Sequence, residues 1–306
     1  MAHTSTLTLG GDLEVHRLGF GAMRITGDGI WGPPADRDAA LAVLRRAVEL
    51  GVDLIDTADS YGPHVSEQLI ADALHPYPEG LVIATKGGLE RSGPGAWSRN
   101  GRPEHLREAC ERSLRDLQVD RIDLYQLHAP DPDVPYAESV GALKELQDEG
   151  KVRHVGVSNV SAEQLDEARS IVDVVSVQNR FNLGDRSSAD VLGVCERDGL
   201  GFFPWFPLAA GNLARPGGVL AEIAEAHDAT PGQVALAWLL ARSPVMLPIP
   251  GTGSPAHLEE NLAAADLSLT DDELERLEQA RSRQASSAWS SAGSVTGRRQ
   301  VNRSQT

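Results

Sequence analysis

Short runs of apolar residues alternate with longer amphipathic segments along most of this 306-residue chain. The apolar runs have the length of strands buried in a parallel sheet, and the segments between them have the spacing of covering helices. Eight such units in about 250 residues close into a barrel more readily than they spread into an open sheet. We expect the strands at Leu18–Gly21, Leu54–Asp56, Leu81–Thr85, Ile122–Leu127, His154–Val157, Val174–Val177, Gly201–Trp205 and Met246–Ile249. The sequence therefore predicts an α/β fold, a (β/α)8 TIM barrel.

Capping signals mark several helix boundaries between these strands. Ser161 with Gln164 forms a capping box, and Thr230 before Pro231 gives a cap followed by proline at the first helical position. We expect helices near residues 36–50, 64–74, 103–117, 136–149, 161–170, 187–198, 231–242 and 255–264.

Two additions flank the expected barrel. In residues 5–17, Gly10 and Gly11 separate two alternating apolar arms, which predicts an N-terminal β-hairpin that caps the barrel bottom. Residues 270–283 predict an extra C-terminal helix. Residues 284–306 have little apolar content, which predicts a disordered tail. We therefore expect one barrel domain over residues 1–283.

Composition excludes several classes of partner. The formal charge of −16 argues against nucleic acid, because phosphate binding needs a basic face. The sequence has no apolar stretch near the ~18 residues of a membrane span, and the N-terminus lacks the pattern of a signal peptide. Cys110 and Cys195 belong to no C-x-x-C pair, which favours a reducing compartment. We expect a cytoplasmic protein whose oligomeric state is left open.

Four polar residues stand at or just after the carboxyl ends of consecutive expected strands, where barrels carry their active sites. They are Asp56, Tyr61, Lys86 and His128. A lysine beside a tyrosine favours the phenolate and lowers its pKa, a carboxylate keeps the lysine charged, and a histidine can donate a hydrogen bond to a carbonyl oxygen. Each residue alone is more often a cap, a packing group or a solvated side chain. Their joint placement favours acid–base chemistry on a carbonyl.

The chain resembles the aldo-keto reductase family over about residues 15–282. The resemblance is carried by RLGFGAM, GVDLIDTADSYG, ATKGG, DLYQLH, KVRHVGVSN, VQNRFN, PLAAGNL and IPGTGS with HLEENL. It implies a catalytic tetrad at Asp56, Tyr61, Lys86 and His128, a small-molecule aldehyde or ketone as substrate, and a nicotinamide cofactor that supplies hydride.

The resemblance also implies where the cofactor binds. Ser158, Asn159 and Gln178 would hold the nicotinamide carboxamide, and Trp205 would stack on its ring. The segment Pro207–Leu213 would cover the pyrophosphate. The full implied set is Gly21, Met23, Ser158, Asn159, Gln178, Trp205, Pro207, Leu208, Gly211, Leu213, Gly251, Thr252, Gly253, Ser254, His257, Glu260 and Asn261.

The choice between NADP(H) and NAD(H) rests on the last loop. Many NADP-dependent members carry basic residues there, whereas this chain has Gly253, Ser254 and His257. The family's general habit still favours NADP(H), and NAD(H) remains the alternative.

The element G-x-W-G-P-P-x-D-R around Trp31 is similar to the pyridoxal reductase-like branch of the family, whose members are also called pyridoxine 4-dehydrogenases. Trp31 and Trp97, the latter in a long loop after Lys86, are the candidate substrate-pocket residues. The expected substrate is an aldehyde on a small aromatic or heteroaromatic ring, with pyridoxal as the leading candidate.

Three other functions are weighed against this one. A barrel aldolase would use Lys86 for a Schiff base, although Asp56 would keep that lysine charged. A regulatory subunit of the same fold would bind cofactor with little turnover. A metallohydrolase is disfavoured because the histidines show no H-x-H or H-x-x-x-H spacing, so no metal is expected.

Overall fold

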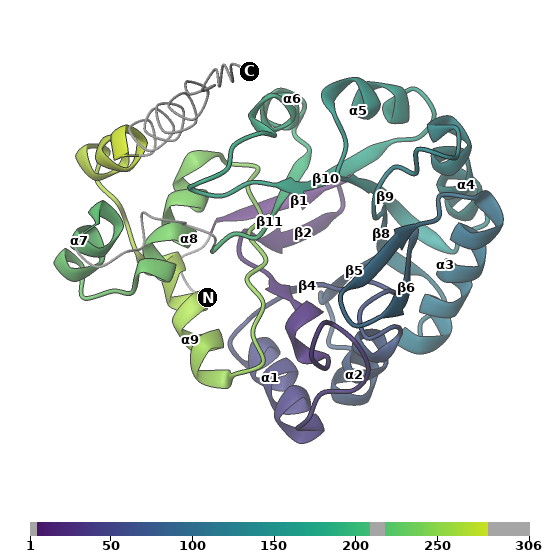
Figure 1. Ribbon diagram of the computed structural model, residues 1–306, viewed down its shortest axis with the longest axis horizontal. Helices are drawn as coiled ribbons and strands as arrows, with labels where there is room; N and C mark the ends of the chain where they lie inside the picture. The colour runs from purple at the N-terminus through teal and green to yellow at the C-terminus, as the bar shows by residue number, and fades with distance from the viewer. Residues whose placement is uncertain (1–4, 209–217, 281–306) are drawn as a thin grey trace, which may run out of the picture.

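The computed structural model describes residues 5–208 and 218–280. Seven parallel strands form one sheet in the order β11-β10-β9-β8-β5-β4-β3, and helices surround them in Figure 1. In chain order the strands are β3 (Phe20–Gly21), β4 (Leu54–Asp56), β5 (Val82–Gly87), β8 (Ile122–Leu127), β9 (Val152–Ser158), β10 (Val174–Arg180) and β11 (Gly201–Trp205). All seven lie at the positions that the apolar runs predict.

The eighth expected strand, Met246–Ile249, closes the barrel in a different way from the others. It makes only a single β-bridge, between Phe202 and Met246. Beyond that, the nitrogen of Leu247 donates to the oxygen of Phe202, and the nitrogens of Gly19 and Gly21 donate to the oxygens of Pro248 and Pro250. Because prolines carry no N–H, this segment cannot form a regular ladder. The (β/α)8 barrel is nevertheless closed between β11 and β3.

The expected helices are all present, and the structure adds one. The main helices are α1 (Arg37–Glu49), α2 (Val65–Leu74), α3 (Pro103–Leu117), α4 (Tyr136–Asp148), α5 (Ala162–Arg169), α6 (Ala189–Asp198), α7 (Val219–Ala226), α8 (Pro231–Arg242) and α9 (Pro255–Ala263). The predicted capping box forms at Ser161, and the predicted cap at Thr230 forms a capping box as well, with Gln233. Helix α7 is not predicted from the sequence: it begins after Gly218 without a side-chain cap, and so lacks the capping signal that marks α5, a helix of the same length.

The N-terminal hairpin pairs β1 (Thr6–Leu9) with β2 (Leu13–His16). Its apolar side chains Leu9, Leu13 and Val15 join a buried cluster with residues from the strands, among them Leu54 and Phe203. The hairpin thus fills one end of the barrel, as expected, and leaves the carboxyl ends of the strands open for function (Figure 1).

The segment after Lys86 corrects the expectation of a long loop. It forms a second hairpin, β6 (Leu89–Gly93) paired with β7 (Ala96–Arg99). Short 3-10 turns at Ala22–Ile25 and Ala264–Asp266 were also not predicted. These turns are shorter than the windows in which hydrophobic periodicity can be recognised.

Residues 271–280 are helical and account for most of the expected C-terminal helix. The end of that helix and the predicted tail, residues 284–306, lie outside the described residues. Across the described ranges, none of the helices combines the length and the apolar character needed to cross a bilayer.

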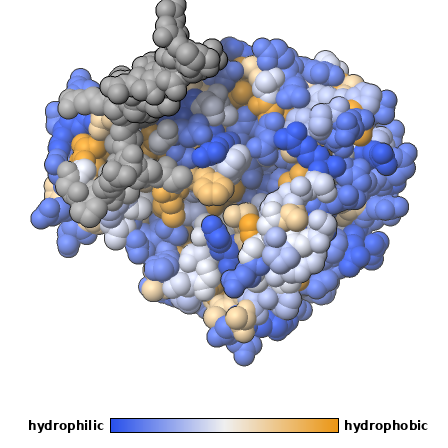
Figure 2. Space-filling view, in the orientation of Figure 1, coloured by the Kyte–Doolittle hydropathy of each residue, from blue (hydrophilic) through white to orange (hydrophobic). Residues whose placement is uncertain are grey.

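Large exposed hydrophobic side chains occur near the carboxyl ends of the strands. Figure 2 shows a mostly hydrophilic face with small, scattered hydrophobic patches, some of them near its centre. Among the described residues, the large exposed hydrophobic side chains are those of Trp97, Phe206 and Leu208. One lies in the hairpin that follows β5 and the others just after β11, so apolar groups meet solvent where barrels bind ligands.

Candidate active site

The four predicted catalytic residues lie together at the carboxyl ends of three adjacent strands. Asp56 ends β4, Lys86 is next to last in β5, and His128 directly follows β8. Tyr61 lies in the turn between β4 and α2. Strand β5 pairs with both β4 and β8, so the sheet register brings these positions side by side.

Asp56 and Lys86 form a buried ion pair at the centre of the site. The lysine Nζ donates to Asp56 Oδ1 at 2.7 Å and to the Thr57 carbonyl oxygen at 2.7 Å, and both side chains are almost completely buried. Burial alone would lower the pKa of Lys86, but Asp56 and Tyr61 outweigh it, and the net shift is upward. The lysine is therefore held as an ammonium ion.

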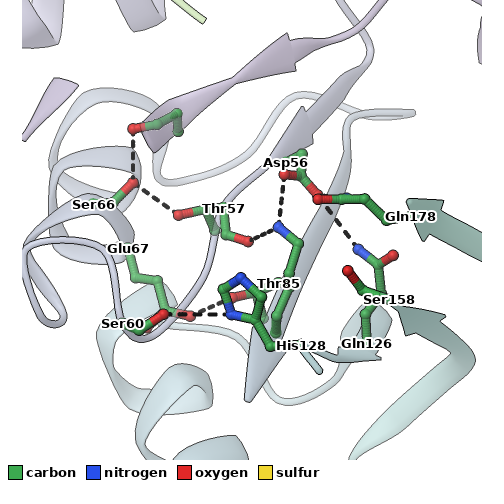
Figure 3. A network of polar contacts seen from close by, with 12 residues as sticks. Asp56, Thr57, Ser60, Ser66, Glu67, Thr85, Gln126, His128, Ser158 and Gln178 are labelled. Atoms are coloured by element: carbon green, nitrogen blue, oxygen red, sulfur yellow. Dashed lines mark hydrogen bonds and ion pairs between the residues drawn. The ribbon is translucent and has the colours of Figure 1, made fainter. Parts of the chain in front are cut away.

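Two glutamines complete the surroundings of Asp56. Its second oxygen, Oδ2, accepts from Nε2 of Gln178 at 2.8 Å and from Nε2 of Gln126 at 3.3 Å. Figure 3 shows these bonds converging on the carboxylate from β8 and β10. A carboxylate fixed by this many donors holds Lys86 in one orientation.

Tyr61 lies directly beside Lys86, whose Nζ is 5.2 Å from the centre of the phenol ring. The tyrosine is buried, and burial raises the pKa of its hydroxyl above the ordinary value of 10, while Lys86 offsets only part of that rise. This corrects the expectation that the lysine lowers the pKa overall. Removing the phenolate from water costs more than the one nearby ammonium restores.

His128 completes the group and lies beside Tyr61. The two rings meet edge to face with centroids 5.9 Å apart, and Ser60 Oγ lies 3.4 Å from His128 Nδ1. Burial, together with the charge of Lys86, lowers the pKa of His128 well below 6.5. The imidazole is therefore neutral near pH 7 and can act as a hydrogen-bond donor.

Trp97 lies beside Tyr61 and His128, and Trp31 is linked to Trp97 through Arg91. The Trp97 ring meets Tyr61 at 6.4 Å and His128 at 6.5 Å, measured between centroids. Arg91 lies with its guanidinium carbon 3.6 Å from the centre of the Trp97 ring and 5.8 Å from that of Trp31. Both tryptophans named from the sequence are therefore joined through an arginine that the sequence did not single out.

Arg91 also forms hydrogen bonds with neighbouring segments of the backbone. Its guanidinium donates to the carbonyl oxygens of Ile30 and Gly29, in the loop before Trp31, and to that of Ser60. It donates as well to its own hairpin, at the Ala96 carbonyl oxygen. One side chain thus links three segments of the barrel mouth.

The residues expected to bind nicotinamide form a connected set beside the tetrad. Asn159, in a left-handed backbone conformation, donates through Nδ2 to the His128 carbonyl oxygen at 2.9 Å and to Ser158 Oγ at 3.0 Å. Its Oδ1 accepts from Nε1 of Trp205 at 3.1 Å. The indole ring is thereby fixed in orientation, as a stacking surface requires.

The loop from Gly251 to Ser254 leads into α9 and offers an anion site. Ser254 is the N-cap of this helix, and no acidic side chain stands in its first turn. Gly251 packs so closely that a Cβ there would lie 2.4 Å from the Gly21 carbonyl oxygen. The positive end of a nine-residue helix with no acidic side chain in its first turn suits a phosphate group, so these residues fit the predicted cofactor.

The remaining predicted cofactor residues differ in their position and burial. Gly21 ends β3, Met23 lies in the turn that follows, and Thr252 and Asn261 are buried. His257 is exposed on α9, and Pro207 and Leu208 follow β11. Glu260 accepts a hydrogen bond from the Thr230 hydroxyl at 2.7 Å. Gly211 and Leu213 lie outside the described residues.

The sequence does not predict several residues that lie in or near the site. Gln126 precedes the strand end by one position and gives no pattern of its own. Phe206 stands beside Trp205 with ring centroids 5.4 Å apart, and Arg180 lies over both rings. Arg24 contacts the Gly251–Gly253 loop from the turn after β3. Only the three-dimensional neighbourhood identifies these residues.

Comparisons with known proteins agree with this geometry. The sequence model of the aldo/keto reductase family matches residues 17–282. An uncharacterised oxidoreductase of Schizosaccharomyces pombe is 50% identical over 269 residues, which cover 88% of each chain. Pyridoxine 4-dehydrogenase of Escherichia coli is 43% identical over 282 residues, covering 90% of this chain and 98% of that one.

A solved structure shows the same fold. The aldo/keto reductase of Klebsiella pneumoniae in complex with NADP and acetate superposes with a TM-score of 0.76 at 29% identity. The match covers 90% of this chain and 95% of the other.

Proposed function

The chain belongs to the aldo/keto reductase family of oxidoreductases, and from that premise we propose that it reduces an aldehyde or ketone to the alcohol with Tyr61 as proton donor. The observation that carries the proposal is the convergence of Tyr61, Lys86 and His128, with Lys86 ion-paired to Asp56, at one end of the barrel.

The cofactor proposed for this site is NADP(H), with NAD(H) as the alternative. Ser158, Asn159 and Trp205 would hold the nicotinamide, and the loop before α9 would hold a phosphate. The Klebsiella relative bound to NADP supports the phosphorylated cofactor. When bound, the reduced nicotinamide supplies the hydride for the carbonyl carbon.

The residues of this chain perform the other half of the addition. His128, neutral at neutral pH, donates a hydrogen bond to the carbonyl oxygen and polarises the bond. Tyr61 transfers its hydroxyl proton to that oxygen as hydride adds to carbon, which yields the alcohol. The ammonium of Lys86 stabilises the negative charge that remains on Tyr61, and Asp56 keeps Lys86 charged and in place.

The proposed substrate is an aldehyde on a small heteroaromatic ring, and pyridoxal is the leading candidate. Two observations support it: the aromatic pair of Trp97, which lies beside Tyr61, and Trp31, which is joined to Trp97 through Arg91, and the 43% identity to pyridoxine 4-dehydrogenase. A flat ring can lie against flat walls with favourable stacking.

The two alternatives, a Schiff-base aldolase and a regulatory subunit with little turnover, find less support. A Schiff-base lysine needs a lowered pKa, whereas Lys86 has a raised pKa and two of its hydrogen bonds are made to Asp56 and Thr57. A regulatory subunit would bind cofactor without a working proton donor, and this chain retains all four predicted catalytic groups.

The test is steady-state oxidation of NADPH and NADH with pyridoxal, nitrobenzaldehyde and methylglyoxal as substrates. We expect turnover of pyridoxal by the wild type, with NADPH preferred. The Tyr61→Phe variant should lose roughly 10²- to 10⁴-fold in kcat, because it lacks the proton donor. Its cofactor affinity, measured by quenching of tryptophan fluorescence, should stay unchanged.

The outcomes separate the parts of the proposal. Good turnover of another carbonyl without pyridoxal turnover would remove the substrate assignment alone. Full activity in Tyr61→Phe would refute the role of Tyr61. Tight cofactor binding with negligible turnover of every carbonyl would favour the regulatory alternative.

A further inference from the structure

A second group of ionisable side chains lies between α2 and α3, apart from the four predicted catalytic residues. His64 is the N-cap of α2, Glu67 is in its first turn, and Asp116 is in the last turn of α3. Each offers one ligand-type atom within 4.8 Å of the other two. His64 Nδ1 and Asp116 Oδ2 are 3.4 Å apart.

The atoms that face one another in this group lack hydrogen bonds. Among the described residues, His64 Nδ1, Glu67 Oε2 and Asp116 Oδ2 are all shielded from solvent and make no hydrogen bond. Glu67 is completely buried. Leaving a buried polar atom unsatisfied typically costs about 1–3 kcal/mol. Asp116 Oδ2 has long ion-pair contacts with His64 Nδ1 at 3.4 Å and with Arg112 Nε at 3.5 Å, and Glu67 Oε2 makes no hydrogen bond, so the three atoms leave a place for a closer, shared partner.

The other oxygen of each carboxylate is already fixed by a neighbour. Glu67 Oε1 accepts from the Thr85 hydroxyl at 2.7 Å, as Figure 3 shows, and Asp116 Oδ1 accepts from Gln68 Nε2 at 3.1 Å. Outer hydrogen bonds of this kind orient carboxylates that bind metal ions through their remaining oxygen.

We propose that His64, Glu67 and Asp116 bind a divalent transition-metal ion of the zinc class. Metal–ligand bonds of about 2.1 Å at tetrahedral angles place ligand atoms about 3.4 Å apart, which matches the His64–Asp116 separation. One nitrogen and two oxygens suit Zn²⁺, Co²⁺ or Mn²⁺ better than Ca²⁺ or Mg²⁺, which prefer oxygen ligands alone. Water would complete the coordination.

An ion can reach this position from a cavity of about 410 Å³ that His64 and Arg112 help to line. Arg112 Nε lies 3.5 Å from Asp116 Oδ2, so its guanidinium competes with a metal ion for that oxygen. The arginine side chain is half exposed and can turn into solvent when an ion binds.

A metal ion at this site would stabilise the turn between β4 and α2, which carries Tyr61, and would take no part in hydride transfer. The backbone nitrogen of His64 donates to the carbonyl oxygen of Asp59, and the backbone nitrogen of Ser66 donates to the carbonyl oxygen of Tyr61. A bound ion would join the end of this turn to α3. The sequence signal is a histidine and a glutamate three residues apart at a helix start, a spacing that a search for histidine pairs does not detect.

The experiment is a titration of EDTA-treated, full-length protein without a polyhistidine tag, at about pH 8 so that the ligands are deprotonated. Co²⁺ should give saturable visible absorption at one ion per chain, and Zn²⁺ should displace it and raise the melting temperature. Asp116→Asn and Glu67→Gln should each weaken Co²⁺ binding by roughly tenfold or more.

Two further variants sharpen the test. Glu104→Gln, at an exposed position of α3 that does not line the cavity, is the matched control and should bind Co²⁺ as the wild type does. Arg112→Gln removes the competing cation and should tighten binding. No saturable Co²⁺ absorption in the wild type, or the same affinity in Asp116→Asn and Glu104→Gln, would overturn the proposal, and the Asp116 variant keeps it testable if Glu67→Gln does not fold.

Discussion

Tyr61 shows how one residue's chemistry depends on competing surroundings. The sequence brings Tyr61 and Lys86 together, and from that pairing alone the tyrosine pKa should fall. Burial is the larger effect and raises it. The identities of the catalytic residues could thus be predicted from their spacing and from the family resemblance. The net direction of the pKa could not, because burial is a property of the assembled barrel.

A pH profile follows from these directions. Carbonyl reduction needs the protonated form of Tyr61, and a raised pKa keeps that form present as pH rises to about 10. His128, with its lowered pKa, stays neutral at and above its ordinary pKa of 6.5. With saturating cofactor and a slow substrate, kcat for reduction should therefore be level from about pH 6.5 to about 10 and should fall only above that range.

The reverse reaction provides the control for this profile. Alcohol oxidation needs the deprotonated tyrosine, so its rate should climb with pH over the same interval. A loss of reductase activity with a midpoint near neutrality would contradict the assignment, because Tyr61 would then be deprotonated too easily.

At the scale of the element, the hairpin β6–β7 separates what could be predicted from what could not. The sequence predicts the long helices because their hydrophobic periodicity repeats over several turns, and it predicts the strands because each is a short apolar run between amphipathic segments. The hairpin spans few residues and carries mostly polar side chains, so it was interpreted as a loop. The contact that makes it functional, Arg91 against Trp97 and Trp31, joins segments about 60 residues apart and gives no local pattern.

Arg91→Met should loosen this hairpin and its tryptophan. Methionine keeps the length of the side chain but removes the cation and the hydrogen bonds to Ile30, Gly29 and Ser60. Losing a cation–π contact of about 1 kcal/mol corresponds to a five- to tenfold effect, so KM for an aromatic aldehyde should rise by about that factor. The measurement is KM for pyridoxal beside KM for methylglyoxal, which should change little.

Arg99→Met, an exposed arginine on the same hairpin, is the matched comparison and should leave both KM values unchanged. Equal effects of the two substitutions would mean that Arg91 does not position the aromatic wall.

For the whole molecule, the family resemblance and the alternation of segments were sufficient to predict the barrel, the hairpin at its bottom and the order of its strands. They did not predict how the barrel closes. The last segment contains Pro248 and Pro250, so closure depends on a few bonds to Gly19 and Gly21 and on close backbone packing. This feature depends on distances of a few ångströms between residues more than 200 positions apart.

Gly251→Ala tests this closure. The new Cβ would lie 2.4 Å from the Gly21 carbonyl oxygen, and a backbone atom in a barrel cannot move aside easily. We expect a loss of roughly 1–3 kcal/mol in unfolding free energy, seen as a lower melting temperature without cofactor. Gly141→Ala, in α4 where a Cβ meets nothing within 4 Å, should be neutral or stabilising. A melting temperature for Gly251→Ala equal to that of Gly141→Ala would show that the contact is not tight.

The two prolines also have a consequence for motion. Amide protons in a continuous ladder of backbone hydrogen bonds exchange slowly with solvent. Where two segments are joined by isolated hydrogen bonds, as between residues 246–250 and their neighbours β11 and β3, these bonds can open locally while the neighbouring strands stay paired. This junction lies beside the loop proposed to bind the cofactor phosphate. A bound dinucleotide should therefore stabilise the junction and slow hydrogen exchange at Gly19, Gly21 and Leu247 more than elsewhere in the sheet.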